Sequence, residues 1–480
     1  MTPPDKIIHR NYWLDEALAL ETPGSDAPPL DRDRRADVAI VGGGYTGLWT
    51  AIDLKTREPS LDVVLIERDI CGWGASGRNA GYLLNLWAKF ATMKRRFGRD
   101  EAVAIGRAVD QGIEDLVQFC DDNGIDAEIR RHGWLMAATR PHHDGHWPAM
   151  MDDLARHQIT PYEELSGAEI ESRWGLSGIL SGMLDRTAGH LQPAKLVRGL
   201  RRVALERGVT IHEHTGLTGL ERRRPPVVRT DHGSITADKV VIAMNAWGAR
   251  LPELRRFIMV TGYGNAMTAP QPERLQETGF ADGPCVNDSY NLINSLRPTA
   301  GGRVLFGKPG TALALGGHVD ASFEDDTARL LDADRRRKEL DPIMPGLQAT
   351  YAWSGPIDRS RDGLPVFGPL PGSPDIVHAT GFSGDGVGPC RLAGKVLASL
   401  VLETPDELTA LGLVRPPDPE FPPEPVRWIG TKLVRRAAGK IDLAARDNGR
   451  VGATTRRLGK LIAAGVADTE AAAKETSTGS

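Results

Sequence analysis

A glycine-rich segment near the start of the chain is the feature that most constrains its fold. The sequence GGGYTG at 42–47 fits the pattern G-x-G-x-x-G and follows a short β-branched run at 37–41. A stretch with helical spacing comes next, at 48–55, and a second strand is predicted at 62–66. Glu67 ends that strand, 20 residues after the last glycine of the motif. This order of strand, glycine turn, helix, strand and acid predicts a Rossmann-like unit that binds a dinucleotide.

Each residue type in this unit has a physical role. Gly42 permits the tight turn, Gly44 lets the backbone approach a pyrophosphate, and Gly47 lets the helix pack close to the sheet. The first N–H groups of the helix and its positive dipole end then hold the diphosphate. Glu67 accepts hydrogen bonds from the ribose hydroxyls. A glycine turn that binds nothing would not require an acid at this spacing, so we favour the dinucleotide site.

Composition and charge exclude several classes of protein. Apolar residues make up 40% of the chain and charged residues 25%, as in ordinary globular proteins, and 480 residues predict two to four domains. The formal net charge of −4 provides no field for a nucleic-acid backbone, which disfavours an RNA-modifying enzyme. Because no run approaches ~18 apolar residues and acids stand where a signal peptide needs an apolar core, we expect a soluble intracellular protein.

The cysteine and histidine residues predict neither a metal site nor a disulfide framework. The cysteines form no CxxC pair, which favours a reducing cytoplasm, and Cys390 is expected to be a small core residue. Near His190, His212 and His214, no further metal ligand lies at helical or CxxC-like spacing. The four cysteines are Cys71, Cys120, Cys285 and Cys390.

Two further glycine-rich loops resemble motifs of a known family. The sequence GWGASGRNAG at 72–81 resembles the second flavin motif of the D-amino-acid oxidase, glycine oxidase and sarcosine oxidase superfamily. The sequence ATGFSGDGVG at 379–388 resembles the late loop of that family, and a helical run follows it at 391–402. Between the two loops, the sequences at 353–355 and 362–365 resemble the family's strand and turn. The resemblance covers most of the chain and implies FAD as the cofactor.

The motifs and the resemblance together predict a set of FAD-binding residues. The linkage cysteine of sarcosine oxidase has no counterpart near Tyr351–Gly355, and the 72–87 loop contains no histidine, so non-covalent FAD is expected. The predicted contacts are Gly42, Gly44, Tyr45, Thr46, Gly47, Glu67, Arg68, Gly74, Ala75, Ser76, Gly77, Arg78, Asn79, Gly81, Leu217, Trp353, Gly381, Gly384, Gly386 and Val387.

The resemblance implies an α/β fold with two parts. One is a discontinuous, Rossmann-like FAD-binding domain of the glutathione-reductase type, and the other is an α+β substrate domain with an antiparallel sheet. Beyond them, a proline-rich linker at 403–426 leads to a basic helical tail at 427–480, whose end is expected to be disordered. The tail helix either packs on its own domain or contacts an acidic membrane or partner. The FAD-binding domain is predicted at 1–85, 190–262 and 350–402, and the substrate domain at 86–189 and 263–349.

The family oxidises a C–N bond, which implies the reaction class. A neutral amine passes a hydride to the flavin, and the imine that results is hydrolysed to a carbonyl; oxygen or another acceptor reoxidises the flavin. Because positioning supplies much of the rate, no catalytic triad is needed. Within the superfamily the chain is similar to the gamma-glutamylputrescine oxidoreductase group, which shares Tyr12–Leu14 and the spelling GWGASGRN. This implies a primary or secondary amine, polyamine-like or derived from an amino acid.

Three residues are candidate catalytic groups. Sarcosine-oxidase-like members hold a carboxylate with two basic residues, and neither is present here, at 82–87 or at Gly388. Arg297 lies near where some members of the family place a basic residue facing the flavin, so the resemblance implies either an alternative carboxylate clamp, as in a D-amino-acid or glycine-type oxidase, or a surface arginine. Asp385 stands where members usually carry histidine and could pair with a cationic amine or bond the loop, and Lys308 is a candidate cation for oxygen reactivity. An alternative of another class is a flavin-binding subunit whose tail docks a second protein.

Overall fold

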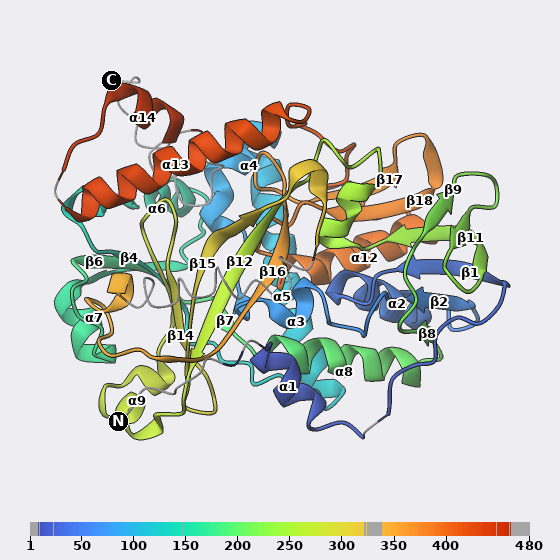
Figure 1. The fold of residues 1–480 in the computed structure, drawn as a ribbon, viewed down its shortest axis with the longest axis horizontal. Helices are drawn as coiled ribbons and strands as arrows, with labels where there is room; N and C mark the ends of the chain where they lie inside the picture. Colours follow the sequence, from blue (N-terminus) through green and yellow to red (C-terminus); the bar gives the residue numbers. More distant parts are fainter. Residues whose placement is uncertain are drawn as a thin grey trace.

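Two eight-stranded sheets, each built from separated parts of the chain, form the framework of the computed structural model. The structure describes residues 8, 10–22, 24–145, 147–320, 323, 338–447, 449–459 and 461. In Figure 1 the first sheet lies on the right and the second toward the left. The predicted α/β fold, with a Rossmann-like part and a second part, is confirmed.

The first sheet has the strand order β17-β18-β11-β1-β2-β8, with β10 and β9 added beside β11. The five strands from β18 to β8 are parallel, as the predicted dinucleotide unit requires. β2 and the last four residues of β1 are buried, as expected for strands covered on both faces. The strands are β1 (Arg34–Val41), β2 (Val63–Ile66), β8 (Thr210–His212), β9 (Gly219–Glu221), β10 (Val227–Arg229), β11 (Ser234–Ile242), β17 (Val366–Leu370) and β18 (Ser373–Thr380).

The second sheet has the order β16-β12-β15-β14-β13-β4-β6-β5 and is mostly antiparallel. A short pair, β3 (Tyr82–Leu83) with β7 (Gly189–His190), stands apart from both sheets. The strands of the second sheet are β4 (Trp134–Ala138), β5 (Tyr162–Ser166), β6 (Ser181–Asp185), β12 (Met259–Thr268), β13 (Cys285–Asp288), β14 (Ser295–Pro298), β15 (Val304–Leu313) and β16 (Ala349–Arg359).

The pairing of β16 changes one expected boundary. The sequence predicts residues 350–402 as part of the FAD-binding domain, but β16 pairs antiparallel with β12 from Met259 to Thr268 and belongs to the second sheet. The family motif at 353–355 indicates a strand and does not reveal the strand's partner. The consequence is functional, because the last residues of β16 reach the space between the two sheets.

The helices cover the sheets and bring two helix starts together. α2 and α12 both pack on the first sheet and on each other, and α5 packs on α12. The described α-helices are α1 (Tyr12–Leu18), α2 (Tyr45–Arg57), α3 (Ala75–Arg78), α4 (Phe90–Phe97), α5 (Arg99–Asp122), α6 (Pro148–Ala155), α7 (Gly167–Trp174), α8 (Pro193–Glu206), α9 (Pro272–Glu277), α12 (Pro389–Val401), α13 (Val426–Arg446) and α14 (Ala453–Gly459).

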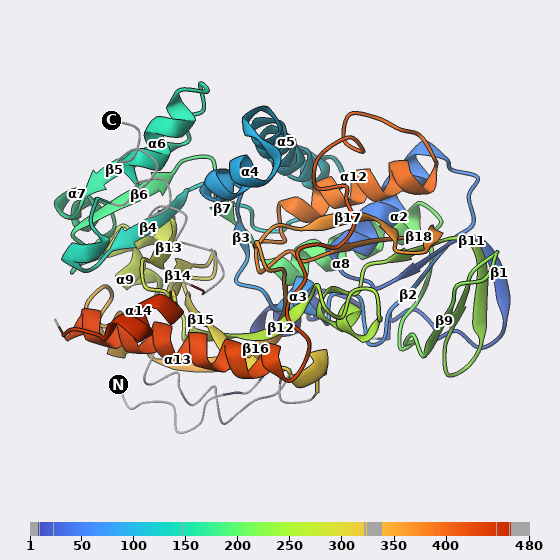
Figure 2. The same ribbon diagram turned by 90° about the horizontal axis from the view of Figure 1, so that it is seen from above.

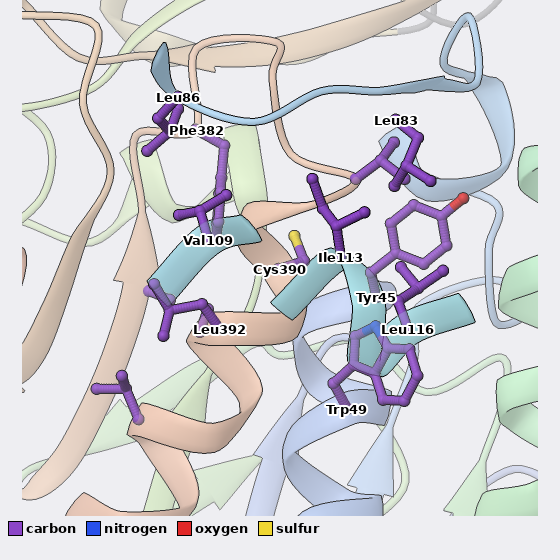
Figure 3. Packing of buried hydrophobic residues seen from close by; sticks show 14 of the residues in the cluster. Tyr45, Trp49, Leu83, Leu86, Val109, Ile113, Leu116, Phe382, Cys390 and Leu392 are labelled. Atoms are coloured by element: carbon purple, nitrogen blue, oxygen red, sulfur yellow. The ribbon is translucent and has the colours of Figure 1, made fainter. Parts of the chain in front are cut away.

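A buried cluster fixes the relative position of α2, α5 and α12. Figure 3 shows Trp49 of α2, Ile113 of α5 and Leu392 of α12 within this cluster. The hydroxyl of Thr46 lies 3.2 Å from the Cys390 sulfur, so the first turns of α2 and α12 are in direct contact. Cys390 is buried, as expected. Two helix N-termini therefore face the same region of the molecule.

The C-terminal segment packs against the second sheet through α13. The Asp442 carboxylate of α13 accepts hydrogen bonds from the main-chain N–H groups of Asn291 (3.0 Å) and Leu292 (2.9 Å), in the loop between β13 and β14. Arg427, near the start of α13, donates to the carbonyl of Ile258 just before β12. The predicted basic helix is thus present and packs on its own chain. The expected disorder of 470–480 concerns residues outside the described part.

Candidate active site

A cavity lies where the two sheets meet, and residues of both sheets line it. Its lining runs from the glycine turn of the first sheet to strands of the second sheet, so it is a concave site of the kind that binds ligands. Described parts of the chain that are far apart in sequence contribute: the turn after β1, the end of β2, α3, the middle of β12, strands β13, β14 and β16, and the turn before α12.

The glycine turn after β1 forms one end of the cavity. Gly42 has a φ of +114°, and a side chain there would overlap the carbonyl of Ala243, so glycine is required. Gly44 lines the cavity and stands at the N-cap of α2, which has no side-chain cap, so N–H groups of the first turn are available to a ligand. A Cβ at Gly47 would overlap the carbonyl of Gly42. Gly47 therefore lies behind the cavity wall and permits its shape.

Glu67 lies in the cavity wall close to the glycine turn. Its carboxylate accepts main-chain hydrogen bonds from Gly43 (2.7 Å) and Asp69 (3.1 Å), and it lines the cavity. Burial raises the pKa of Glu67 above its usual value, although these two N–H groups act in the opposite direction. Close by, the Arg68 guanidinium lies 4.7 Å from the centre of the Trp247 ring. Leu217 also lines this end, so the wall is flat and partly apolar, as an adenine requires.

The ASGR loop forms the middle of the cavity wall as α3. Gly74, Ala75, Ser76, Arg78 and Asn79 line the cavity. The Ser76 hydroxyl accepts the N–H of Tyr45 at 2.9 Å, which ties this loop to the start of α2. Small residues here leave space for a flat ring against the backbone.

The Arg78 backbone is held from the second sheet. Its carbonyl accepts the indole N–H of Trp353 (2.9 Å) and the side-chain amide of Asn265 (3.0 Å). Trp353 is buried and is not among the residues that line the cavity, so it supports the loop from behind. Gly77 and Gly81 lie behind the wall in the same way, because a Cβ at either would overlap a neighbouring carbonyl.

The loop before α12 closes the far end of the cavity. Gly384, Gly386 and Val387 line it, whereas Gly381 lies behind them and donates its N–H to the Asp358 carboxylate at 2.6 Å. Burial raises the pKa of Asp358 to about 6. The N-cap of α12 has no side-chain cap, so the helix start presents positive potential to the cavity.

Of the three candidate catalytic residues, Asp385 lines the cavity. Its carboxylate lies 2.6 Å from the Nζ atom of Lys89, which also donates to the carbonyl of Gly363 at 2.7 Å. Arg359 lies in the same wall, and its Nε–H donates to the Thr261 hydroxyl at 3.3 Å. Lys89 and Arg359 belong to no motif, and only the folded chain brings them to Asp385.

Arg297 and Lys308 do not line the cavity. Arg297 is 2% exposed, and its guanidinium donates to the carbonyls of Ala80, Leu191 and Pro298. It therefore braces the segment that follows the ASGR loop, and the structure gives no geometry for Arg297 as a carboxylate clamp. Lys308 pairs with Glu339 and donates to Asn294 at 3.3 Å, so its charge is paired outside the cavity.

The substrate end of the cavity has a polar wall that no sequence motif indicates. The hydroxyl groups of Tyr263 and Ser295 are hydrogen-bonded to each other, and Asn287 lies in the same wall. These residues come from three strands of the second sheet, so only the strand order brings them together. Asn265, Tyr82, Leu84, Ile293 and Asn245 complete this region.

The described residues contain no group of three or more His, Cys, Asp or Glu side chains that could hold a metal ion. Among the same residues, no helix is long and apolar enough to cross a membrane.

Cys390 lines the cavity, and burial raises the pKa of its thiol to about 12, so it stays protonated at neutral pH.

The cavity walls thus fit an adenine dinucleotide that carries a flat ring: a glycine cradle at a helix start, an acid for ribose, and a small-residue loop beneath the ring. This fold and site define the class of flavin-dependent oxidoreductases. Residues 37–400 match the family described as FAD dependent oxidoreductase, and the chain belongs to that family. FAD is its cofactor, so the predicted oxidoreductase is confirmed.

Comparison with individual proteins agrees. Gamma-glutamylputrescine oxidoreductase of Escherichia coli is 30% identical over 78% of this chain and 85% of its own. A probable oxidoreductase, OrdL, of Rhizobium meliloti is 30% identical over 85% of this chain and 92% of its own. The crystal structure of glycine oxidase from Geobacillus kaustophilus has a TM-score of 0.58 at 24% identity and covers 79% of this chain and 99% of that one.

Proposed function

We propose that this protein oxidises the C–N bond of a primary or secondary amine that also carries a negatively charged group. The reaction class is supported by the similarity to gamma-glutamylputrescine oxidoreductase and glycine oxidase. The requirement for a negatively charged group on the substrate is supported by one observation: the guanidinium of Arg359 lines the cavity and has Nη atoms without a hydrogen-bond partner among the described residues.

The guanidinium of Arg359 has N–H groups that can bind a ligand in the cavity. Within the described residues, its Nε–H donates to Thr261, and its two Nη atoms have no hydrogen-bond partner. Asp385, the nearby acid, is paired with Lys89 instead. Burial lowers the pKa of Arg359, but a guanidinium stays charged at neutral pH. A carboxylate that enters the cavity would compensate it and accept paired N–H groups.

Asp385 and Lys89 act as a neutral pair in this proposal. The chemistry that bound FAD supplies is acceptance of a hydride from the carbon next to the amine nitrogen. A lone carboxylate in the cavity would oppose the accumulation of negative charge on reduction, and the Lys89 ammonium offsets it. Asp385 is thus engaged by Lys89, and the Nη atoms of Arg359 at the substrate end have no hydrogen-bond partner among the described residues.

The polar wall positions the amine. Tyr263, Ser295 and Asn287 present hydroxyl and amide groups, which accept and donate hydrogen bonds without carrying charge. Such groups can hold a neutral amine, the form that passes a hydride. Arg359 and this wall together fix both ends of the substrate, and alignment of the reacting carbon supplies much of the rate.

Anaerobic reduction of the bound flavin tests the proposal. The wild type is mixed with an N-alkyl amino acid or with its methyl ester, and the flavin absorbance band is followed. We expect the carboxylate to be half-saturating at a lower concentration than the ester. Arg359→Leu should raise that concentration about 10- to 100-fold for the carboxylate, the loss expected for a charged hydrogen bond, and leave the ester nearly unchanged.

Arg361→Leu is the matched control, because Arg361 is exposed and lies two residues further on. Equal effects of Arg359→Leu on both compounds would contradict the role of Arg359. A flavin that no amine reduces would favour the flavin-binding subunit over the enzyme. We also propose a cytoplasmic location, which the four buried cysteines, all without a disulfide, support.

A further inference from the structure

Helix α13 presents two very different sides. Its inner side packs on the chain: Ala437 and Ala438 are buried, Arg427 reaches the carbonyl of Ile258, and Asp442 binds the β13–β14 loop. The helix lies along the outside of the molecule next to the second sheet, and α14 packs on its C-terminal half (Figures 1 and 2). The inner side is therefore occupied by contacts within this chain.

The outer side of α13 mixes apolar and basic residues. Four large apolar side chains on it are each 46–59% exposed. Four basic residues are interleaved with them at helical spacing and are also exposed. We call this set the outer face: Val426, Ile429, Leu433 and Leu443 with Lys432, Arg436, Lys440 and Arg446.

The segment that carries the outer face is strongly basic. The sequence from 426 to 461 contains ten basic and two acidic residues, on a chain whose net charge is −4. One of the two acids, Asp442, binds the β13–β14 loop on the inner side, and the other, Asp447, follows the helix and pairs with Arg446. No ion pair of Arg436 or Lys440 is present among the described residues.

We infer that the outer face of α13 binds the surface of a lipid bilayer rich in anionic phospholipids, with the helix parallel to that surface. Apolar side chains that alternate with Lys and Arg insert between headgroups while the cations meet the phosphates. The Nζ atom of Lys432 lies 3.4 Å from the centre of the Trp428 ring. A cation and an aromatic ring of α13 are therefore in contact, and both side chains have an apolar part and a polar end.

Neither a nucleic acid nor the chain itself matches the outer face as well as a lipid surface does. A nucleic acid would use the cations but gain nothing from the exposed Ile429 and Leu433. Packing on its own chain occupies the inner side and leaves these residues in water. Exposed apolar side chains in a row, rimmed by one sign of charge, match an anionic lipid surface in both respects. This inference goes beyond the proposed reaction and does not depend on the identity of the amine.

Co-sedimentation with vesicles tests the inference on the full, FAD-loaded chain. The vesicles are phosphatidylcholine alone, or phosphatidylcholine with about 30% phosphatidylglycerol. We expect binding to the anionic vesicles, little binding to the neutral ones, and weaker binding at about 0.5 M salt, where charges are screened within about 4–5 Å. Each basic side chain near the surface contributes about fivefold to partitioning, so Lys432→Gln with Arg436→Gln and Lys440→Gln should lower it about 100-fold.

Two further variants separate the outcomes. Ile429→Ser with Leu433→Ser should also weaken vesicle binding but should not change binding to a DNA duplex. The matched control is Arg32→Gln with Arg223→Gln and Arg224→Gln, three exposed arginines away from α13, and it should bind vesicles like the wild type. All variants are checked for FAD content, which reports folding.

Three results would overturn the inference. They are a wild type that does not sediment with anionic vesicles, a control that loses as much binding as the outer-face variant, and DNA binding that exceeds vesicle binding and ignores the Ile429 and Leu433 changes. Amine turnover is not part of the measurement, so its failure would leave this result unaffected.

Discussion

The Nζ atom of Lys89 lies 2.6 Å from the carboxylate of Asp385 in the wall of the FAD cavity. Lys89→Met should therefore leave an uncompensated negative charge beside the flavin and make its midpoint potential more negative. The expected shift is on the order of 20–40 mV, which corresponds to about 1–2 kcal/mol for a two-electron couple. A dye-equilibration titration measures it, and Lys89→Met with Asp385→Asn should restore the wild-type potential. An unchanged potential in the single variant would show that the pair does not act on the flavin.

The glycines of the first motif should differ in their effect on FAD binding. Gly47→Ala should abolish it, because the new Cβ would overlap the carbonyl of Gly42 and displace the start of α2. Gly44→Ala should be milder, since its Cβ would meet the movable side chain of Ser76 at 2.8 Å. The ratio of flavin to protein absorbance after purification gives the occupancy. Gly430→Ala, where the Cβ meets nothing within 4 Å, is the control and should keep full occupancy.

Two hydrogen bonds to one carbonyl support the flavin loop. Trp353→Phe removes one of these bonds to the Arg78 carbonyl, and Asn265 still supplies the other. The single variant should weaken FAD binding by about 1 kcal/mol, or about fivefold. Adding Asn265→Ala should cost more than the two single changes together, because the carbonyl is then left unpaired in a buried place. Fluorescence titration of the apoprotein with FAD gives the four affinities, and strict additivity would contradict the shared role.

A buried acid, Asp288, lies beside the substrate end and should make stability depend on pH. Burial raises the pKa of Asp288 to about 7, although Asn294 donates to its carboxylate at 2.6 Å. The folded protein therefore binds a proton that the unfolded chain releases near pH 4, and this stabilising difference is lost as the pH rises through about 7. Asp288→Asn carries no such charge, so its stability relative to the wild type should rise between about pH 5 and pH 8. The gain is ~2–3 kcal/mol as an order of magnitude.

Urea unfolding of the wild type and of Asp288→Asn, at about pH 5 and about pH 8, measures the free energies of unfolding that check this prediction. Asp31→Asn, at an exposed position, is the control and should show no change of relative stability between them. An Asp288 variant that loses stability relative to the wild type as the pH rises would contradict the direction of the pKa shift.

The sequence predicted the parts of the site that are local in the chain. The turn at 42–47, Glu67 and the ASGR loop are each short segments of one piece of backbone, and Gly42, Glu67 and Ser76 of these segments line the cavity. Glycines such as Gly47 and Gly381 were predicted as contacts and lie behind the wall instead. A glycine in a motif indicates that a side chain would not fit there. The space can be needed by a ligand or by a neighbouring carbonyl group, and the motif does not distinguish the two.

The substrate end could not be predicted because it depends on strand order. Arg359 of β16 and Tyr263 of β12 are far apart in sequence, and the antiparallel pairing of these strands brings them into one wall. Arg297 matched the expected residue type for a carboxylate, but the loop after α3 uses its guanidinium. Nothing in the local sequence separates an arginine that braces a loop from one that faces a cavity.

The hydrogen bonds from Asn291 and Leu292 to Asp442 have a mechanical consequence. The next residue, Ile293, lines the cavity, so a single carboxylate on the tail helix anchors part of the chamber in which the amine reacts. A movement of α13 would therefore also move Leu292 and its neighbour Ile293 in the cavity wall. We expect that removing the tail helix would change the position of this wall.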